Sequence, residues 1–139
     1  MTFLLASAVS AAALDLLSKQ VAMRRLRTAG GVPHHRGWFS FQLVKNRRGA
    51  LIAMPRGVAS ALWLAASAAM LYAVHAAGPL SPRMEAGLGL VAGGAAGNLI
   101  ERLMRGGVTD FLAVGNWPVF NLADAAMVCG ALLALLGLA

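Results

Sequence analysis

The sequence predicts an all-α membrane protein, a bundle of four transmembrane helices with a small β-strand element in its first loop. Three observations support this fold class. The 139-residue chain is 59% hydrophobic, with a mean hydropathy of +0.70. Only 12% of its residues are charged, against about 25% in soluble globular domains. Four apolar segments come near the roughly 20 residues that a helix needs to cross a bilayer. We therefore expect one integral-membrane domain over residues 1–139.

The four apolar segments are long and continuous, which favours helices over the short alternating strands of a membrane barrel. The first is interrupted by Asp15 and Lys19, which stand four apart and can form an ion pair on one helix face. No Lys or Arg precedes this run, so a cleaved signal peptide is the less favoured alternative. The expected spans are about 3–22, 57–77, 85–104 and 119–139.

The third segment carries Gly89, Gly93 and Gly97 at a spacing of four residues. This spacing is typical of membrane helices that pack closely through small residues. It is not a phosphate-binding loop, because it lies within an apolar span and no Lys follows it. Glu85 opens the segment, where an acid complements the helix dipole.

The long first loop, residues 24–56, contains the stretch "GWFSFQLVKN". Phe39, Phe41 and Leu43 alternate there with Ser40, Gln42 and Val44, which predicts a strand with one imperfect position. An isolated strand is unstable, so we expect it to pair with a neighbour or to lie at the membrane interface, the level that suits Trp38 and Phe39.

The net charge of +7 is concentrated beside the apolar spans, so anionic lipid headgroups are expected partners rather than nucleic acid. The sequence has one cysteine, Cys129, and no Cys or His spacing typical of a metal site. The residues therefore predict no metal site. By the positive-inside rule the basic first loop would lie in the cytoplasm. Its Lys and Arg residues are Arg24, Arg25, Arg27, Arg36, Lys45, Arg47, Arg48 and Arg56.

Two of the five acids, Asp110 and Asp124, flank the start of the fourth apolar segment. If they met in a poorly hydrated site they could not both ionise easily, and such a pair can share a proton and activate water. The alternative is structural: Asp124 caps helix four, and Asp110 binds backbone amides in its loop. The spacing alone favours the structural alternative. Of the other acids, Glu101 stands beside Arg102, and Asn98 lies one turn before that arginine, where the two can share a polar cluster.

Taken in order, the motifs of the chain resemble those of the lipoprotein signal peptidases, the signal peptidase II family. "DLLSK" is similar to the family's Asp-x-x-x-Lys, and "WFSFQLVKN" to its extracytoplasmic strand. "GNLIER" resembles Gly-Asn-x-x-Asp-Arg, "GVTDF" matches Gly-x-Val-x-Asp-Phe in part, and "WPVFNLAD" is similar to Trp-Pro-x-Phe-Asn-x-Ala-Asp. The resemblance implies catalytic aspartates at Asp110 and Asp124. It further implies substrate-binding or supporting roles, which fall on Asn46, Asn98, Arg102, Asn121, Asp15 and Lys19.

The resemblance also implies an activity: a membrane aspartic endopeptidase that removes the signal peptide of diacylglyceryl-modified prolipoproteins, cutting before the lipidated cysteine. It implies a multi-pass protein of the bacterial inner membrane, with both termini cytoplasmic and the strand element and site near the extracytoplasmic face. We accept this topology over the charge count. The resemblance further implies that no metal or organic cofactor is needed, and a monomer sensitive to globomycin-type inhibitors is expected. The alternatives are a relative with lost or altered activity that binds lipidated peptides, and a small non-enzymatic transporter subunit.

Three departures from the family pattern bear on these expectations. Glu101 stands where the family has Asp, which keeps the charge and lengthens the reach. "NRRGALIA" replaces Asn-x-Gly-Ala-Ala-Phe, which puts substrate handling in doubt. The chain ends at Ala139, without the basic tail common in relatives.

Overall fold

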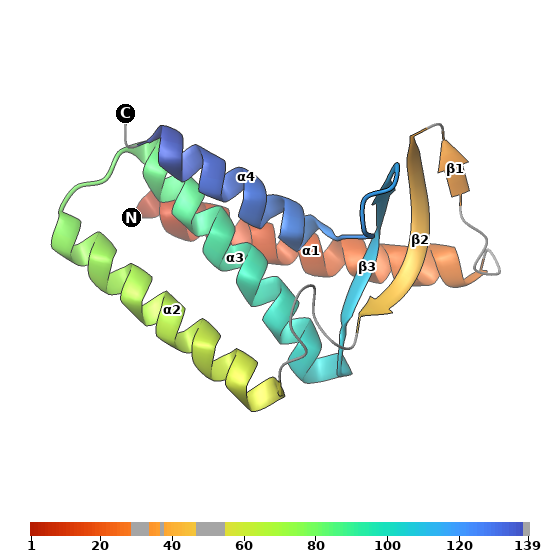
Figure 1. The fold of residues 1–139 in the computed structure, drawn as a ribbon. Helices are drawn as coiled ribbons and strands as arrows, with labels where there is room; N and C mark the ends of the chain where they lie inside the picture. Colours follow the sequence, from red (N-terminus) through yellow and green to blue (C-terminus); the bar gives the residue numbers. More distant parts are fainter. Residues whose placement is uncertain (29–33, 37, 47–54, 138–139) are drawn as a thin grey trace.

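The computed structural model describes residues 1–28, 34–36, 38–46 and 55–137. Within these ranges the chain forms four helices and a three-stranded antiparallel sheet of order β1-β2-β3 (Figure 1). The helices are α1 (Thr2–Thr28), α2 (Arg56–Ala77), α3 (Pro82–Arg105) and α4 (Leu122–Leu136), and the strands are β1 (His34–Arg36), β2 (Phe39–Asn46) and β3 (Val108–Val114). All of the "NRRGALIA" segment except Asn46 lies outside the described residues, and so does Ala139.

Helix α3 is the centre of the bundle. It packs against α1 on one side and α4 on the other, while α2 contacts α3 alone among the described elements. The sheet lies at one end of the bundle, and both chain termini lie at the opposite end (Figure 1). Because β2 pairs with β3, the first loop and the segment before α4 share one end of the molecule, as the sequence predicts.

Glycines allow the close packing of α3 on its neighbours. A Cβ built on Gly89 would collide with the backbone of Leu4, and one built on Gly93 with the backbone of Ala8, both in α1. A Cβ on Gly97 would stand 2.7 Å from the Asp15 carboxylate. The predicted glycine stripe is therefore confirmed, and its third member makes room for a buried acid.

Replacing Gly93 by Ala is expected to weaken the α1–α3 contact, because the new methyl group meets backbone atoms that cannot rotate away. Overpacking of this kind costs about 1–3 kcal/mol. The matched control is Gly57→Ala in α2, where a Cβ meets nothing within 4 Å. Thermal unfolding in detergent measures both. An unchanged midpoint for Gly93→Ala would contradict the packing described here.

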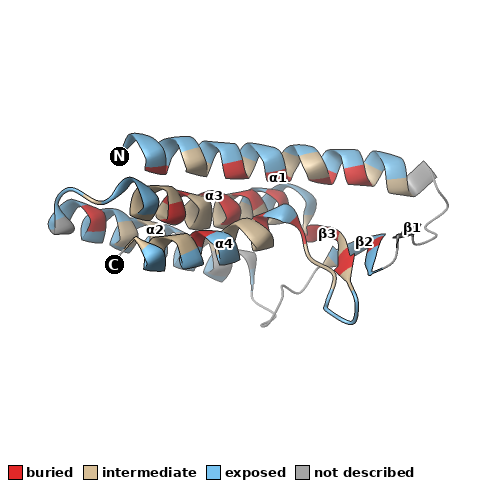
Figure 2. Cartoon of the chain, turned by 90° about the horizontal axis from the view of Figure 1, so that it is seen from above, coloured by how far each residue is buried: buried red, intermediate tan, exposed pale blue. Residues whose placement is uncertain are grey.

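The distribution of polar and apolar side chains is inverted relative to a water-soluble protein. The largest fully buried side chains are Lys19, Glu101, Asn121 and Asp15, whereas large apolar side chains such as Leu64 are exposed. Figure 2 shows the same pattern along the helices, with buried positions facing the interior of the bundle and exposed ones covering its outside. Ionisable groups gathered inside and leucines outside are typical of a protein surrounded by lipid.

By length and composition, one helix in the described part of the chain can cross a membrane, over Thr2–Leu26. Shorter apolar helical stretches cover Ser60–Ala76 and Leu122–Leu136. Helix α1 runs six residues beyond the expected end at residue 22, since the long-chain residues of "AMRRLR" continue the helix.

Helix α4 begins three residues later than predicted, at Leu122. The reason is that Phe120 is extended and pairs with Leu112, donating to its carbonyl at 2.9 Å and accepting from its amide at 2.8 Å. The prediction of a helix from residue 119 was wrong at this point, because a backbone already bonded to a strand cannot enter the helix. Asn121 then caps the helix.

The strand predicted within "GWFSFQLVKN" is confirmed as β2, but the sequence did not identify the neighbouring strand with which it pairs. Strand β3 occupies the region expected to be a loop, so the fold is helical with a three-stranded sheet rather than all-α. Along β2, Ser40 is buried while Phe39 and Phe41 are exposed. The register shifts between Phe41 and Val44, which accounts for the imperfect position in the alternation.

Candidate active site

Asp110 lies within β3 and not in a loop, and its side chain is 5% exposed. Both carboxylate oxygens accept hydrogen bonds from amide side chains. Asn121 Nδ2 donates to Oδ1 at 2.6 Å, and Asn46 Nδ2 donates to Oδ2 at 3.3 Å. Asn46 and Asp110 stand diagonally across the β2–β3 ladder on one face of the sheet, so strand pairing fixes their approach.

Asp124 lies in the first turn of α4 and is half-buried. It forms a capping box with Asn121: the Asp124 amide donates to Asn121 Oδ1 at 3.0 Å, and the Asn121 amide donates to Asp124 Oδ2 at 3.2 Å. Its other oxygen, Oδ1, accepts from Asn98 Nδ2 at 2.9 Å. The helix N-terminus stabilises negative charge on this carboxylate.

Asn121 joins the two aspartates. Its side-chain oxygen accepts from the Asp124 backbone while its side-chain nitrogen donates to Asp110. This asparagine is fully buried and is fixed at the helix start by the capping box. One amide group therefore sets the position of Asp110 relative to the first turn of α4.

A buried ion pair in α1 supports the start of α4. Lys19 Nζ donates to Asp15 Oδ2 at 2.7 Å, the pairing expected from their spacing. The other oxygen of Asp15 accepts from the backbone amide of Ala123 at 2.9 Å, so helix α1 satisfies a free N–H at the first turn of α4. Both charged side chains have no exposed surface.

Asn98 connects this ion pair to Asp124, because its Oδ1 accepts from Lys19 Nζ at 2.7 Å while its Nδ2 donates to Asp124. A continuous hydrogen-bonded network results. It brings together the predicted site residues Asp15, Lys19, Asn98, Asp124, Asn121, Asp110 and Asn46. Arg102 stands apart from it: its Nε is buried without a hydrogen-bond partner in the described part of the chain.

Glu101 is also part of this network, although neither its position nor the family motifs predicted a site role for it. Its Oε2 lies 3.3 Å from Lys19 Nζ and accepts from the Thr109 amide at 2.9 Å, while Oε1 accepts from the Thr109 hydroxyl at 2.6 Å. Thr109 precedes Asp110, so Glu101 holds the backbone that presents that aspartate. The signal in the sequence was an acid inside an apolar span, which usually has a partner.

Thr109→Val is expected to destabilise the protein by about 1–3 kcal/mol, because it deletes the hydroxyl donor to Glu101 and leaves a buried acceptor with weaker bonds. Valine has nearly the shape of threonine, so packing is preserved. Thr109→Ser keeps the hydroxyl and is the matched control. Equal unfolding temperatures for the two variants would contradict a stabilising role for this bond.

Burial raises the pKa of Asp110, and the nearby Asp124 carboxylate raises it further. The hydrogen bonds from Asn121 and Asn46 act in the opposite direction, because they stabilise the ionised form. The pKa of Asp110 is therefore raised above the ordinary value for aspartate. A buried acid and a half-exposed carboxylate, held through one asparagine, can divide the roles of proton donor and proton acceptor toward a water molecule. Among the described residues, no His, Cys, Asp and Glu cluster of three could hold a metal ion.

The family model and the curated relatives that match this chain are all described as signal peptidases. A family model described as signal peptidase (SPase) II matches residues 7–139. A lipoprotein signal peptidase of Rhodococcus jostii (strain RHA1) is 41% identical over 128 residues, which cover 87% of this chain and 64% of that protein. A lipoprotein signal peptidase of Mycobacterium avium (strain 104) is 39% identical over 137 residues, or 94% of this chain and 75% of that protein. The chain thus spans just under two thirds of the Rhodococcus relative.

Two solved structures share the fold. One bacterial membrane enzyme, determined by the in meso method at 2.3 Å resolution, superposes with a TM-score of 0.81 at 21% identity, covering 99% of this chain and 88% of its own. A second, at 1.9 Å resolution, has a TM-score of 0.78 at 21% identity and covers 99% of this chain and 93% of its own. With the family match over nearly the whole chain, the conclusion is direct: this protein belongs to the signal peptidase II family.

Proposed function

We propose that this chain is a membrane aspartic endopeptidase that removes the signal peptide of diacylglyceryl-modified prolipoproteins, cutting before the lipidated cysteine. The observation that carries the proposal is the pair Asp110 and Asp124, held through Asn121 where the sheet meets the first turn of α4. Family membership supports the peptidase activity. The geometry supports the choice of residues.

In the proposed mechanism Asp124 is the ionised member of the pair. It takes a proton from a water molecule, whose oxygen attacks the carbonyl carbon of the residue before the lipidated cysteine. Asp110 carries the shared proton and donates it to the substrate, first as a hydrogen bond to the carbonyl oxygen and then to the leaving amine. This division follows the helix N-terminus at Asp124 and the burial of Asp110.

The remaining network residues have supporting roles in the proposal. Asn46 and Asn121 orient Asp110, and Asn98 orients Asp124. Asp15 and Lys19 hold the first turn of α4 in place from α1. Arg102 is proposed to contact substrate or lipid, which suits a buried Nε without a hydrogen-bond partner in the described residues.

We further propose one domain over residues 1–139, with four membrane spans and both termini in the cytoplasm of a bacterial inner membrane. The location of both termini at the end away from the sheet supports an even number of spans (Figure 1). Trp38 and Trp117, 83% and 72% exposed near the tip of the sheet, suit the outer membrane interface. The chain would act as a monomer without metal or organic cofactor, and globomycin-type inhibitors would block it.

The proposal is tested with two matched prolipoprotein substrates, one carrying a diacylglyceryl group on its cysteine and one without it. The purified protein is expected to cut the lipidated substrate alone, and globomycin is expected to stop this cleavage. Absence of cleavage in both substrates would remove the enzymatic proposal. Binding of the lipidated peptide without turnover would identify a relative with lost activity, and ion flux dependent on Asp124 with processing intact would identify a transporter subunit.

The pH dependence of kcat/KM is expected to be bell-shaped, with both limbs belonging to the coupled aspartate pair. Activity falls at low pH when both carboxyls are protonated, and at high pH when the pair loses its shared proton. Replacing Asn46 by Ala removes a hydrogen bond that lowers the pKa of Asp110, so the basic limb is expected to move to higher pH. Gln42→Ala on the same strand is the control. A basic limb that moves to lower pH in Asn46→Ala would contradict the assignment.

A further inference from the structure

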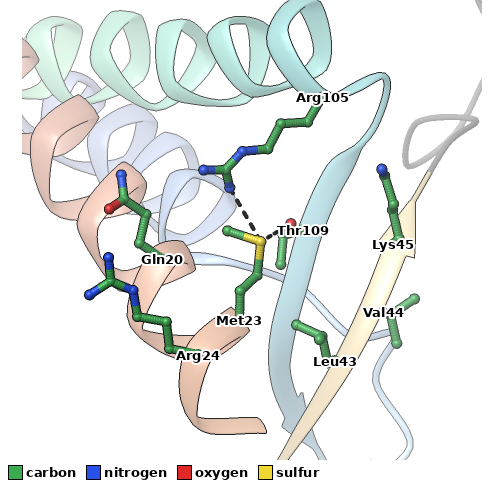
Figure 3. A pocket seen from close by; sticks show the side chains of 8 residues that line it. All are labelled: Gln20, Met23, Arg24, Leu43, Val44, Lys45, Arg105 and Thr109. Atoms are coloured by element: carbon green, nitrogen blue, oxygen red, sulfur yellow. Dashed lines mark hydrogen bonds between the residues drawn. The ribbon is translucent and has the colours of Figure 1, made fainter. Parts of the chain in front are cut away.

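A pocket of about 760 Å³ lies between the C-terminal part of α1, strand β2 and the end of α3 (Figure 3). Three cationic side chains line it, each from a different element: Arg24 from α1, Lys45 from β2 and Arg105 from α3. No acid occurs among the described residues that line it. Like charges collected around one hollow repel each other, so the pocket favours an anionic occupant.

This pocket is separate from the aspartate pair. Thr109 lines the pocket, whereas the next residue, Asp110, faces the opposite side of the sheet because side chains alternate along a strand. Lys45 stands opposite Thr109 in the β2–β3 ladder, and its neighbour Asn46 bonds Asp110. The pocket and the aspartate pair therefore lie back to back across the same two strands.

Arg105 carries five N–H donors, so it can bind a phosphate beside its present partners. Its Nη1 donates to the thioether sulfur of Met23 at 3.2 Å and to Glu101 Oε1 at 3.4 Å, with which it forms an ion pair (Figure 3 shows the Met23 contact). A thioether is a weak acceptor, whereas an ionised phosphate oxygen is a strong one. The Arg105 side chain is 40% exposed, and the negative charge of Glu101 is shared with buried Lys19.

The rest of the pocket is apolar, and its depth suits the membrane surface. The side chains of Met23 and Leu43 form its apolar walls. The membrane-length stretch of α1, Thr2–Leu26, contributes Met23 and Arg24 to the pocket near its C-terminal end. Cations next to an apolar wall at the end of a membrane helix match a phospholipid, whose phosphate adjoins its glycerol and acyl chains. Binding of a lipid phosphate would also explain why the first loop is basic, although the positive-inside rule would place such a loop in the cytoplasm.

We propose that this pocket binds an anionic phospholipid, with Arg24, Lys45 and Arg105 around the phosphate and the apolar walls against the glycerol and the upper acyl chains. The bound lipid anchors the sheet at the membrane surface, with β3 presenting Asp110 on the other side. The site is additional to the proposed peptidase function, because neither aspartate lines the pocket.

The test uses the purified full chain, delipidated in a neutral detergent, with bound lipid counted by native mass spectrometry. Phosphatidylglycerol and phosphatidylcholine with identical acyl chains are titrated, and inorganic phosphate is the third probe. Phosphatidylglycerol is expected to bind at least about fivefold more tightly than phosphatidylcholine, and Arg24→Gln and Lys45→Gln are each expected to weaken it about fivefold. Arg83→Gln, which removes the same charge at an exposed position on the first turn of α3, is expected to change nothing.

Three results would overturn the proposal. Equal affinity for the two lipids would show that the pocket has no preference for an anionic headgroup. An equal loss of phosphatidylglycerol affinity in Arg83→Gln would show a general attraction of the lipid to the basic surface. Inorganic phosphate binding as tightly as phosphatidylglycerol would identify a free-anion site instead. Because the binding assay needs no turnover, it tests the lipid site even if the proposed peptidase activity is not found. If the protein is a peptidase and the pocket is a separate lipid site, Arg24→Gln cleaves a lipidated substrate in neutral detergent at the wild-type rate.

Discussion

Asp124→Asn is expected to lower kcat/KM for a lipidated prolipoprotein by about 10²–10⁴-fold, the usual loss when a catalytic acid or base is removed. The asparagine oxygen can still accept from Asn98 or from the Asn121 amide, which together hold Asp124 in the native protein. The fold should therefore survive, and the unfolding temperature should change little. The measurement is the rate of substrate cleavage, with thermal unfolding of the same preparations beside it.

Asp124→Glu separates catalysis from helix capping. A glutamate at this position of α4 can maintain a capping box, and it keeps the negative charge. It moves the carboxylate by about one bond, and a displacement of about 1 Å can cost about 10²-fold in rate. We expect Asp124→Glu to remain folded and to lose most of its activity. Full activity in this variant would mean that Asp124 serves only as a cap.

Lys19→Met is expected to produce the largest loss of stability in the chain, about 3–5 kcal/mol. Lys19 is completely buried, and its ammonium group lies 2.7 Å from Asp15 and 3.3 Å from Glu101. Methionine fills a similar volume but leaves two buried carboxylates without their shared cation. Because Asp15 also holds the first turn of α4 and Asn98 loses its donor, activity should fall together with stability.

The matched control for this variant is Lys45→Met, which changes the other lysine of the chain at an exposed position. Thermal unfolding of both proteins is compared in a neutral detergent free of anionic lipid. Lys45→Met should unfold near the wild-type temperature. An equally small change in Lys19→Met would show that the buried ion pair contributes little to this fold.

The sequence predicted the four helices well, because each of them is a long and continuous apolar segment. It failed where hydrogen bonding between distant segments decides the structure. Strand β3, "VTDFLAV", was expected to be part of a loop, although glycines bound it on both sides, a pattern typical of strands. The same pairing delayed the start of α4, because Phe120 bonds to Leu112.

The sequence proposed most residues of the hydrogen-bonded network, but it missed Glu101 and the contacts between distant segments. Spacing along one helix correctly paired Asp15 with Lys19. Asn98 was expected beside Arg102, and the structure instead bonds it to Lys19 and Asp124, because contacts between helices do not follow from spacing within one.

The two interpretations of Asp124, a helix cap or half of a reactive pair, also proved compatible. One oxygen completes the capping box and the other accepts from Asn98. The activity of Asp124→Glu distinguishes the two roles.

The central claim is that Asp110 and Asp124 together activate a water molecule that cuts a lipidated substrate. Its most direct test is mass spectrometry of a diacylglyceryl prolipoprotein incubated with the purified protein in water enriched in oxygen-18. The claim predicts a lipoprotein beginning at the lipidated cysteine, and a signal peptide with one oxygen-18 in its new carboxylate. The Asp110→Asn/Asp124→Asn double variant should leave the substrate intact. Cleavage by the double variant at the wild-type rate would contradict the claim.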